Sequence, residues 1–221
     1  PICWAIVTTR LDQGEPLPVV DPGDLLLVLG GPMGVADLGH PDYFWMEQEV
    51  ELLRVALRRQ SPVIGVCLGA QLLAVAGGGT AIPLQLGVPP HPQLEVGFGA
   101  ISWHCDLGQE PLLAGLDQSE LVLYWHGDRC VLPPEAQLLA SSLHCREQAF
   151  RIGSRAIGLQ FHVEVDSPML ETWLEEDADY VIGAIGLDGL ARLRGDAAFW
   201  GERLQRRGRR LVSNLFDQLA P

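Results

Sequence analysis

The chain contains no lysine: all 15 of its basic residues are arginines, against 28 aspartates and glutamates. A lysine Schiff base and a lysine-bearing phosphate-binding loop are therefore excluded. The formal net charge of −13 disfavours a nucleic-acid-binding protein, because neutralising phosphates requires a basic surface. Disorder over most of the chain is also excluded, since 48% of the 221 residues are apolar and can build a core.

Long apolar runs and paired cysteines are missing as well. The run at 25–29 is far shorter than the roughly 18 to 20 residues of a membrane span, and no signal sequence opens the chain. The five cysteines form no CxxC pair, which argues against a disulfide framework and a zinc site. We therefore expect a cytoplasmic protein with free thiols and without a metal or other cofactor, which binds neither membranes nor nucleic acid.

Apolar segments that fit strands alternate with segments that fit amphipathic helices. Continuous apolar runs at 24–29 and 62–66 predict buried strands, and the branched apolar side chains of 2–9 predict another. Apolar residues at helical spacing predict helices over 42–60 and 68–76. Further strands are expected at five less regular places: 94–103, 120–126, 137–142, 148–152 and 156–161. This order predicts an α/β fold with an open, mostly parallel, doubly wound sheet flanked by helices.

The last part of the chain has a different character. Helices are predicted over 168–180 and 197–219, but this stretch is too small and too sparsely apolar to form an independent core. We therefore expect one domain over residues 1–165 and a helical C-terminal extension over 166–221 that packs on it.

A single cysteine lies where the predicted strand 62–66 runs into the helix 68–76. Gly65 and Gly69 flank Cys67, and small neighbours are what a sharp strand-to-helix turn needs. The helix dipole and the free N–H groups at a helix N-terminus favour the thiolate over the thiol. Cys67 is therefore a candidate nucleophile, and the alternative is an ordinary buried cysteine of the core.

The segment GLQFHVE ends the last predicted strand with a base and a carboxylate. His162 and Glu164 are two residues apart, so they point to the same side of an extended chain. An imidazole oriented by a carboxylate is the support that a cysteine nucleophile requires. The alternative is a structural histidine beside a surface glutamate. Because open α/β sheets place their sites at strand ends, we expect this pair to meet Cys67.

A glycine-rich turn, GGPMG at 30–34, follows the strand predicted at 24–29. Backbone N–H groups in such a turn are suited to stabilise a developing oxyanion. A phosphate cradle is the rival interpretation, but the turn carries neither a GxGxxG nor a GK[ST] pattern.

The segments GGPMG, GVCLGAQ and GLQFHVE, in this order, resemble the class I (triad-type) glutamine amidotransferase domain, and YWHGD at 124–128 resembles a further motif of that family. The resemblance covers residues 2–165 and is strongest to stand-alone members similar to the amidotransferase domain of GMP synthetase. The C-terminal helices are similar to tails of such members. The resemblance implies hydrolysis of the side-chain amide of L-glutamine through a Cys thioester, which gives glutamate and ammonia.

The resemblance also assigns roles residue by residue. Cys67 would be the nucleophile, His162 the base and Glu164 its orienting carboxylate. Two backbone N–H groups would form the oxyanion hole, those of Gly31 and Leu68. His126 is expected to be structural, and Trp173 is expected to be a packing residue. Six residues would line the glutamine pocket: Gly30, Met33, Gln71, Trp125, Gly127 and Asp128.

Family members have a strand and a helix before the segment that residues 2–9 resemble, so we expect the first strand and helix of the family to be missing here. No synthetase domain or ATP-binding loop follows the triad. A separate protein would therefore accept the ammonia, or water would be the acceptor. Two alternatives to glutamine hydrolysis stay open: hydrolysis of another γ-glutamyl compound, and a non-catalytic binding module that kept the fold. The intact triad favours an enzyme.

Overall fold

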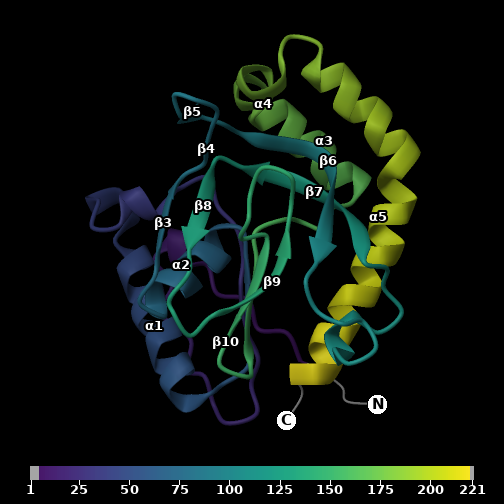
Figure 1. The fold of residues 1–221 in the computed structure, drawn as a ribbon. Helices are drawn as coiled ribbons and strands as arrows, with labels where there is room; N and C mark the ends of the chain where they lie inside the picture. The colour runs from purple at the N-terminus through teal and green to yellow at the C-terminus, as the bar shows by residue number, and fades with distance from the viewer. Residues whose placement is uncertain (1–4, 220–221) are drawn as a thin grey trace.

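The computed structural model describes residues 5–219, which fold around one seven-stranded sheet of order β1-β2-β11-β10-β9-β6-β7 (Figure 1). In that order, the strands are Leu26–Val28, Val63–Val66, Ala156–Leu159, Ala149–Ile152, Gln137–Ser141, Glu95–Trp103 and Ser119–His126. Two further strand pairs lie outside this sheet: β3 (Thr80–Pro83) with β8 (Asp128–Val131), and β4 (Gln85–Leu86) with β5 (His91–Pro92).

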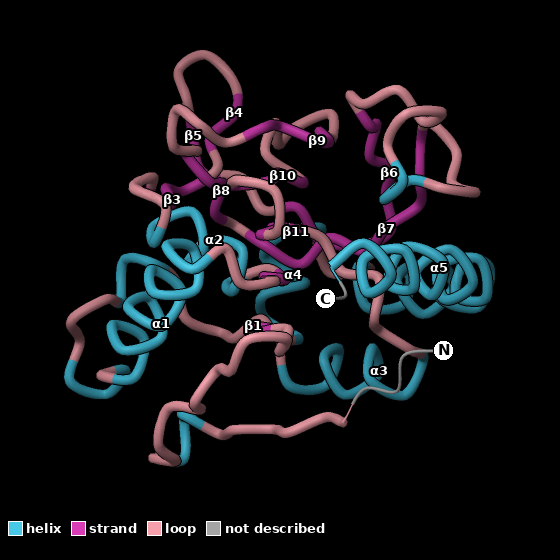
Figure 2. The backbone as a smooth tube through the Cα atoms, turned by 90° about the horizontal axis from the view of Figure 1, so that it is seen from below, coloured by secondary structure: helices cyan, strands magenta, loops and turns pink. Residues whose placement is uncertain are grey.

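Helices cover both faces of the sheet. Figure 2 shows α1 and α2 on one side of the strands and α5 on the other. The α-helices are α1 (Trp45–Arg59), α2 (Leu68–Ala76), α3 (Ser167–Glu176), α4 (Ala178–Ile185) and α5 (Gly189–Leu219). Short 3-10 helices lie at Leu11–Gln13, Val35–Asp37, Pro41–Tyr43 and Pro111–Leu113.

The α/β class, the open sheet with flanking helices and the C-terminal helical part are confirmed, but the sheet is not mostly parallel. Among its described strands, β1 with β2 and β2 with β11 are the parallel pairs, and the other four pairs are antiparallel. The connections explain this difference. A parallel pair needs a long crossover, which α1 provides between β1 and β2, whereas a short turn joins β10 to β11.

The sheet separates two hydrophobic cores. On one side, Val50 and Leu53 of α1 pack with Val63 of β2. On the other side, Leu211 of α5 packs in one cluster with Leu123 of β7 and with side chains of α3 and α4. The C-terminal helices thus share a core with the sheet, while the division into parts at residue 165 stays a prediction. No described helix has the length and apolar character needed to cross a membrane.

Two local predictions are wrong. The strand expected at 2–9 is irregular over residues 5–9, where Ile6 and Val7 are 90% and 85% exposed; residues 2–4 lie outside the described residues. Branched side chains favour a strand only where a partner strand supplies hydrogen bonds and a packing surface. The helix expected over 168–180 is two helices, because Asp177 leaves the helical conformation with φ −110° and ψ 28°.

Candidate active site

Cys67 forms the turn between β2 and α2 in a conformation that side chains rarely adopt, with φ 54° and ψ −110°. A residue held in such a conformation costs about 1 to 3 kcal/mol, and such strain clusters at functional sites. The turn places the thiol at the N-terminus of α2, where the first N–H groups of a helix have no acceptor within it.

The two glycines beside Cys67 let three elements pack closely. A methyl group on Gly69 would lie 2.1 Å from the carbonyl oxygen of Val28 in β1, and one on Gly65 would lie 2.5 Å from the carbonyl oxygen of Gly69. These distances are far inside van der Waals contact, so neither position accepts a side chain. The close packing of β1, β2 and α2 therefore requires glycine at positions 65 and 69, as the sequence indicates for residues flanking a sharp turn.

His162 and Glu164 follow β11 and form an ion pair, with Nδ1 of His162 at 2.6 Å from Oε1 of Glu164. The other carboxylate oxygen accepts a hydrogen bond of 2.9 Å from the backbone N–H of Val163. The backbone of His162 exchanges two hydrogen bonds with Leu123 of β7, of 2.8 and 3.0 Å. The imidazole is therefore fixed through its ring by Glu164 and through its backbone by β7.

The electrostatics of this pair favour charged forms. Burial lowers the pKa of His162, but hydrogen bonds with Cys67 and Glu164 outweigh it and raise the pKa to about 10. Burial raises the pKa of Glu164, yet the interaction with His162 leaves it below its usual value. An imidazolium and a carboxylate are the stable forms at neutral pH. The structure thus brings Cys67, His162 and Glu164 together, with the thiol and the imidazole buried and the carboxylate partly exposed to solvent.

The glycine-rich turn after β1 lies against the thiol and the start of α2. A methyl group on Gly30 would lie 3.3 Å from Cβ of Cys67 and 3.6 Å from Cε1 of His162. A methyl group on Gly31 would lie 3.4 Å from Cδ2 of Leu68. Gly31 and Leu68, the two residues expected to form the oxyanion hole, are therefore close neighbours beside Cys67.

The YWHGD segment reaches the thiol from β7. The carbonyl oxygen of Trp125 lies 3.7 Å from Sγ of Cys67. Gly127 lies beside α4, since a methyl group there would be 3.6 Å from the hydroxyl of Tyr180. Of the expected pocket residues, Trp125 therefore contacts the thiol and Gly127 lies next to Tyr180.

Met33 and Asp128 lie at the glycine-rich turn. Met33 packs on Gly31, where its Cε would be 3.4 Å from an added methyl group. A carboxylate oxygen of Asp128 would be 3.1 Å from a methyl group on Gly34. Burial and the nearby charge of Asp37 raise the pKa of Asp128, against an opposite effect of His126. This side of the site therefore carries crowded carboxylates.

Gln71 lies behind the thiol. It is 4% exposed, and its amide donates to the side-chain oxygen of Gln160 at 3.3 Å. The amide of Gln160 in turn donates to Sγ of Cys67 at 3.8 Å. The sequence interpretation missed Gln160 as a neighbour of the thiol, although it stands within the GLQFHVE segment two residues before His162.

Three side chains of the C-terminal helical part also reach the site. The ring of Trp173 in α3 lies 5.0 Å from the ring of His162, edge to face. The indole N–H of Trp125 donates to Asp177 at 3.2 Å, and Tyr180 of α4 lies 6.2 Å from Trp125, ring to ring. No local sequence signal indicates these contacts, because they depend on how α3 and α4 turn back over β7.

Among the described residues, one group has the chemistry to hold a metal: Glu95, His126 and Cys145, all buried, with ligand atoms within 4.8 Å of one another. The amide nitrogen of Gln148 lies between them, 2.7 Å from Glu95 and 3.3 Å from His126. Nδ1 of His126 donates to the carbonyl oxygen of Asp128 at 2.9 Å. Glu95 and His126 are thus already engaged in hydrogen bonds. Through His126, these bonds hold the YWHGD segment in place.

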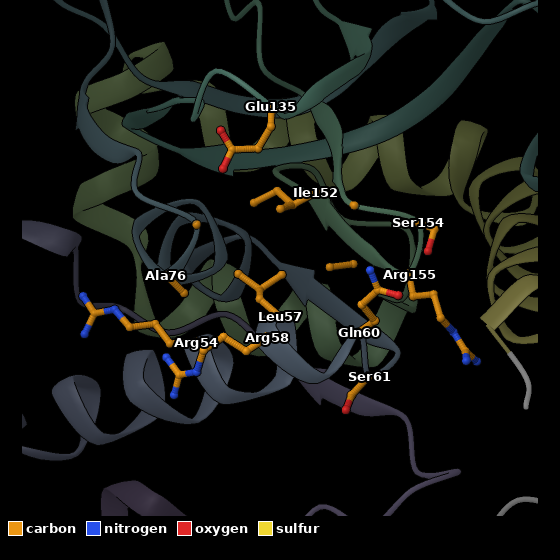
Figure 3. A pocket seen from close by; sticks show the side chains of 13 residues that line it. Arg54, Leu57, Arg58, Gln60, Ser61, Ala76, Glu135, Ile152, Ser154 and Arg155 are labelled. Atoms are coloured by element: carbon orange, nitrogen blue, oxygen red, sulfur yellow. The ribbon is translucent and has the colours of Figure 1, made fainter.

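A cleft of about 430 Å³ lies at the far end of β2 and β11 from Cys67 (Figure 3). It is lined by the C-terminal ends of α1 and α2 and by the turn between β10 and β11. Arg54 and Arg58, at this cleft, both pair with Glu51. None of the residues expected at the active site lines the cleft, so it is separate from the triad.

Comparisons with known proteins agree with this geometry. The family model described as "Glutamine amidotransferase class-I" matches residues 8–177. The chain is 30% identical over 185 residues to the glutamine amidotransferase-like protein YfeJ of Salmonella typhimurium, and the match covers 83% of this chain and 74% of YfeJ. It is 31% identical over 153 residues to a protein of Ignicoccus hospitalis named as one subunit of a glutamine-hydrolyzing GMP synthase, covering 67% and 72% of the two chains.

Solved structures show the same relationship. A crystal structure of a glutamine amidotransferase from Thermotoga maritima superposes with a TM-score of 0.76 at 26% identity, and covers 93% of this chain and 84% of that one. The chain spans about a quarter of the length of the longer GMP synthases that it also matches. Family model, relatives and fold agree: the chain belongs to the class I glutamine amidotransferase family.

Proposed function

We propose that this chain hydrolyses the side-chain amide of L-glutamine to glutamate and ammonia, with Cys67 as nucleophile. The observation that carries the proposal is the strained turn at Cys67 beside a fixed His162–Glu164 pair. Membership of the class I family supports the same chemistry.

In the first half of the reaction, the thiolate of Cys67 attacks the amide carbon and the carbonyl oxygen becomes an oxyanion. The backbone N–H groups of Gly31 and Leu68 would stabilise this charge. His162, an imidazolium at neutral pH, gives its proton to the departing nitrogen. The C–N bond then breaks, ammonia leaves, and a γ-glutamyl thioester on Cys67 remains.

In the second half, water attacks the thioester. The imidazole of His162 takes a proton from the water, and the C–S bond breaks to release glutamate and restore Cys67. Glu164 stays ionised throughout and holds the ring through Nδ1, so the reactive nitrogen keeps its direction.

We also propose a separate protein as the acceptor of the ammonia. Two relatives are named as one subunit of a glutamine-hydrolyzing GMP synthase, which supports a two-protein arrangement. Four cysteines among the described residues are free thiols, which supports the reducing cytoplasm as the location.

The test is ammonia release from L-glutamine by the purified chain, with Cys67→Ala as the matched control. We expect turnover by the original chain and its loss, by at least about a thousandfold, in the variant. Circular dichroism must show that both proteins are folded. Equal release by both proteins contradicts the nucleophile. A folded chain that binds a partner but hydrolyses no γ-glutamyl amide would instead be a binding module.

A further inference from the structure

The described site includes a face built largely by the C-terminal helices. We call Trp125, Trp173, Asp177 and Tyr180 the outer wall. Trp125 lies 5.3 Å from Trp173 and 6.2 Å from Tyr180, ring to ring, and donates its indole N–H to Asp177. All four residues are half-buried, so the wall borders the site and stays open to solvent.

The outer wall lies against His162, the residue that protonates the departing amine in the proposed reaction. Its Trp173 packs edge to face on the ring of His162 at 5.0 Å. In the proposed reaction His162 protonates the leaving nitrogen, so that nitrogen passes next to His162. Any substituent on the nitrogen then lies along Trp173 and its neighbours in the wall.

The surroundings of the wall are negatively charged. Burial and the charges of Cys67, Asp128 and Asp177 together raise the pKa of Tyr180, because all three groups lie near its hydroxyl. Asp128 is itself close to Asp37. The ion pairs of the described residues include none of Asp37, Asp128 and Asp177. Their charges are therefore not neutralised by an arginine.

Aromatic faces combined with an unneutralised carboxylate attract cations that have an alkyl stem. The methylene groups pack on the indole rings, and the cation meets the carboxylate. A neutral or anionic substituent would gain no comparable interaction here, and an anion would be repelled by the neighbouring aspartates.

We propose that the site accepts γ-glutamyl amides whose departing amine carries a second, protonated nitrogen, which Asp177 on the outer wall binds. This inference rests on the proposed function and names its substrate class. The chemistry is unchanged: the amide C–N bond breaks, the amine takes the proton of His162, and water supplies the oxygen that releases glutamate from Cys67.

The experiment compares three substrates: N-(4-aminobutyl)-γ-glutamylamide, the uncharged N-butyl-γ-glutamylamide and L-glutamine. Release of glutamate gives kcat/KM for each. We expect the aminobutyl amide to exceed the butyl amide by about tenfold or more. Asp177→Asn should lower kcat/KM for the aminobutyl amide about tenfold more than kcat/KM for the butyl amide and for glutamine. The asparagine keeps an oxygen that accepts from Trp125, so this variant removes charge rather than a contact.

The matched control is Asp179→Asn, which removes an exposed carboxylate two residues away in α4. It should leave all three substrates unchanged. Equal kcat/KM for the two N-alkyl amides, or an equal loss on all three substrates in Asp177→Asn, overturns the inference while glutamine turnover still supports the proposed function. If the folded chain turns over none of the three, both the inference and the proposed function are wrong.

Discussion

At the scale of single residues, the His162–Glu164 pair sets the protonation state of the site. The folded-state pKa of His162, about 10, lies above the ordinary value of 6.5. The raised pKa of His162 therefore contributes stability that is fully present below about pH 6.5, as long as Glu164 stays ionised, and that is lost as the pH rises through about 10. In the proposed mechanism, the histidine would therefore begin the reaction at neutral pH already carrying the proton that the leaving amine needs.

Substituting Glu164 by glutamine tests this assignment. The amide keeps a hydrogen-bond acceptor but loses the negative charge, so the pKa of His162 should fall. Side-chain NMR of labelled histidine would follow the titration in both proteins. A midpoint near 6.5 in the original chain, or the same midpoint in Glu164→Gln, would contradict the role of the carboxylate.

Residue patterns in the sequence single out Cys67, His162 and Glu164, which lie together in the structure, because Cys67 and His162 each stand where a strong apolar strand ends. They do not predict Trp173, Asp177 and Tyr180, whose place depends on the break between α3 and α4. Arg207 illustrates the same limit. An arginine-rich helix end is most simply interpreted as a solvated face, whereas Arg207 pairs with the buried Glu120 of β7 and with Asp117.

At the scale of elements, α5 supports the segment that carries the base. Its backbone at Gly208 touches this segment, since a methyl group on Gly208 would lie 2.3 Å from the carbonyl oxygen of Val163. Val163 stands between His162 and Glu164. The C-terminal helix α5 thus packs directly against the segment that carries His162 and Glu164.

Two glycines of α5 give a matched pair of substitutions. Gly208→Ala should lower the free energy of unfolding by about 2 to 4 kcal/mol, because the new methyl group overlaps the Val163 backbone. Gly195→Ala, with no atom within 4 Å of its methyl group, should raise it by about 0.5 to 1 kcal/mol. Urea unfolding measures both. Equal effects of the two substitutions would contradict the close approach of α5.

The sequence predicts best the elements that have a helical period, α1 and α2, and the strand with a continuous apolar run, β2. The pairing of β3 with β8 is missed because its partners, Thr80–Pro83 and Asp128–Val131, are far apart in the chain and short. At 5–9 the opposite error occurs: the sequence predicts a strand where the structure has none. These residues have strand propensity, but none of the described strands lies beside them as a partner.

At the scale of the whole molecule, the sheet is covered on one face by helices from the end of the chain. Ile101, Leu123 and Phe161 of the sheet side belong to the same core as Leu204 and Leu211 of α5. Removing the helices would expose this apolar face to water.

A chain that ends at residue 166 should therefore fail to fold cooperatively. We expect loss of the near-UV circular dichroism signal and strong binding of an apolar dye such as ANS, as in a loosely packed state. Cooperative thermal unfolding of the shortened chain would instead support an independent domain over residues 1–165.

The origin of the outer wall has a consequence for how such a protein diversifies. The triad comes from two strand ends, whereas Trp173, Asp177 and Tyr180 come from one short stretch at the junction of α3 and α4. Under the substrate class proposed above, substitutions in that stretch would change which amine departs and would leave Cys67, His162 and Glu164 where they are. The proposed selectivity would then depend on a single contiguous peptide, so a library confined to residues 172–180 is the natural starting point for engineering a new leaving group.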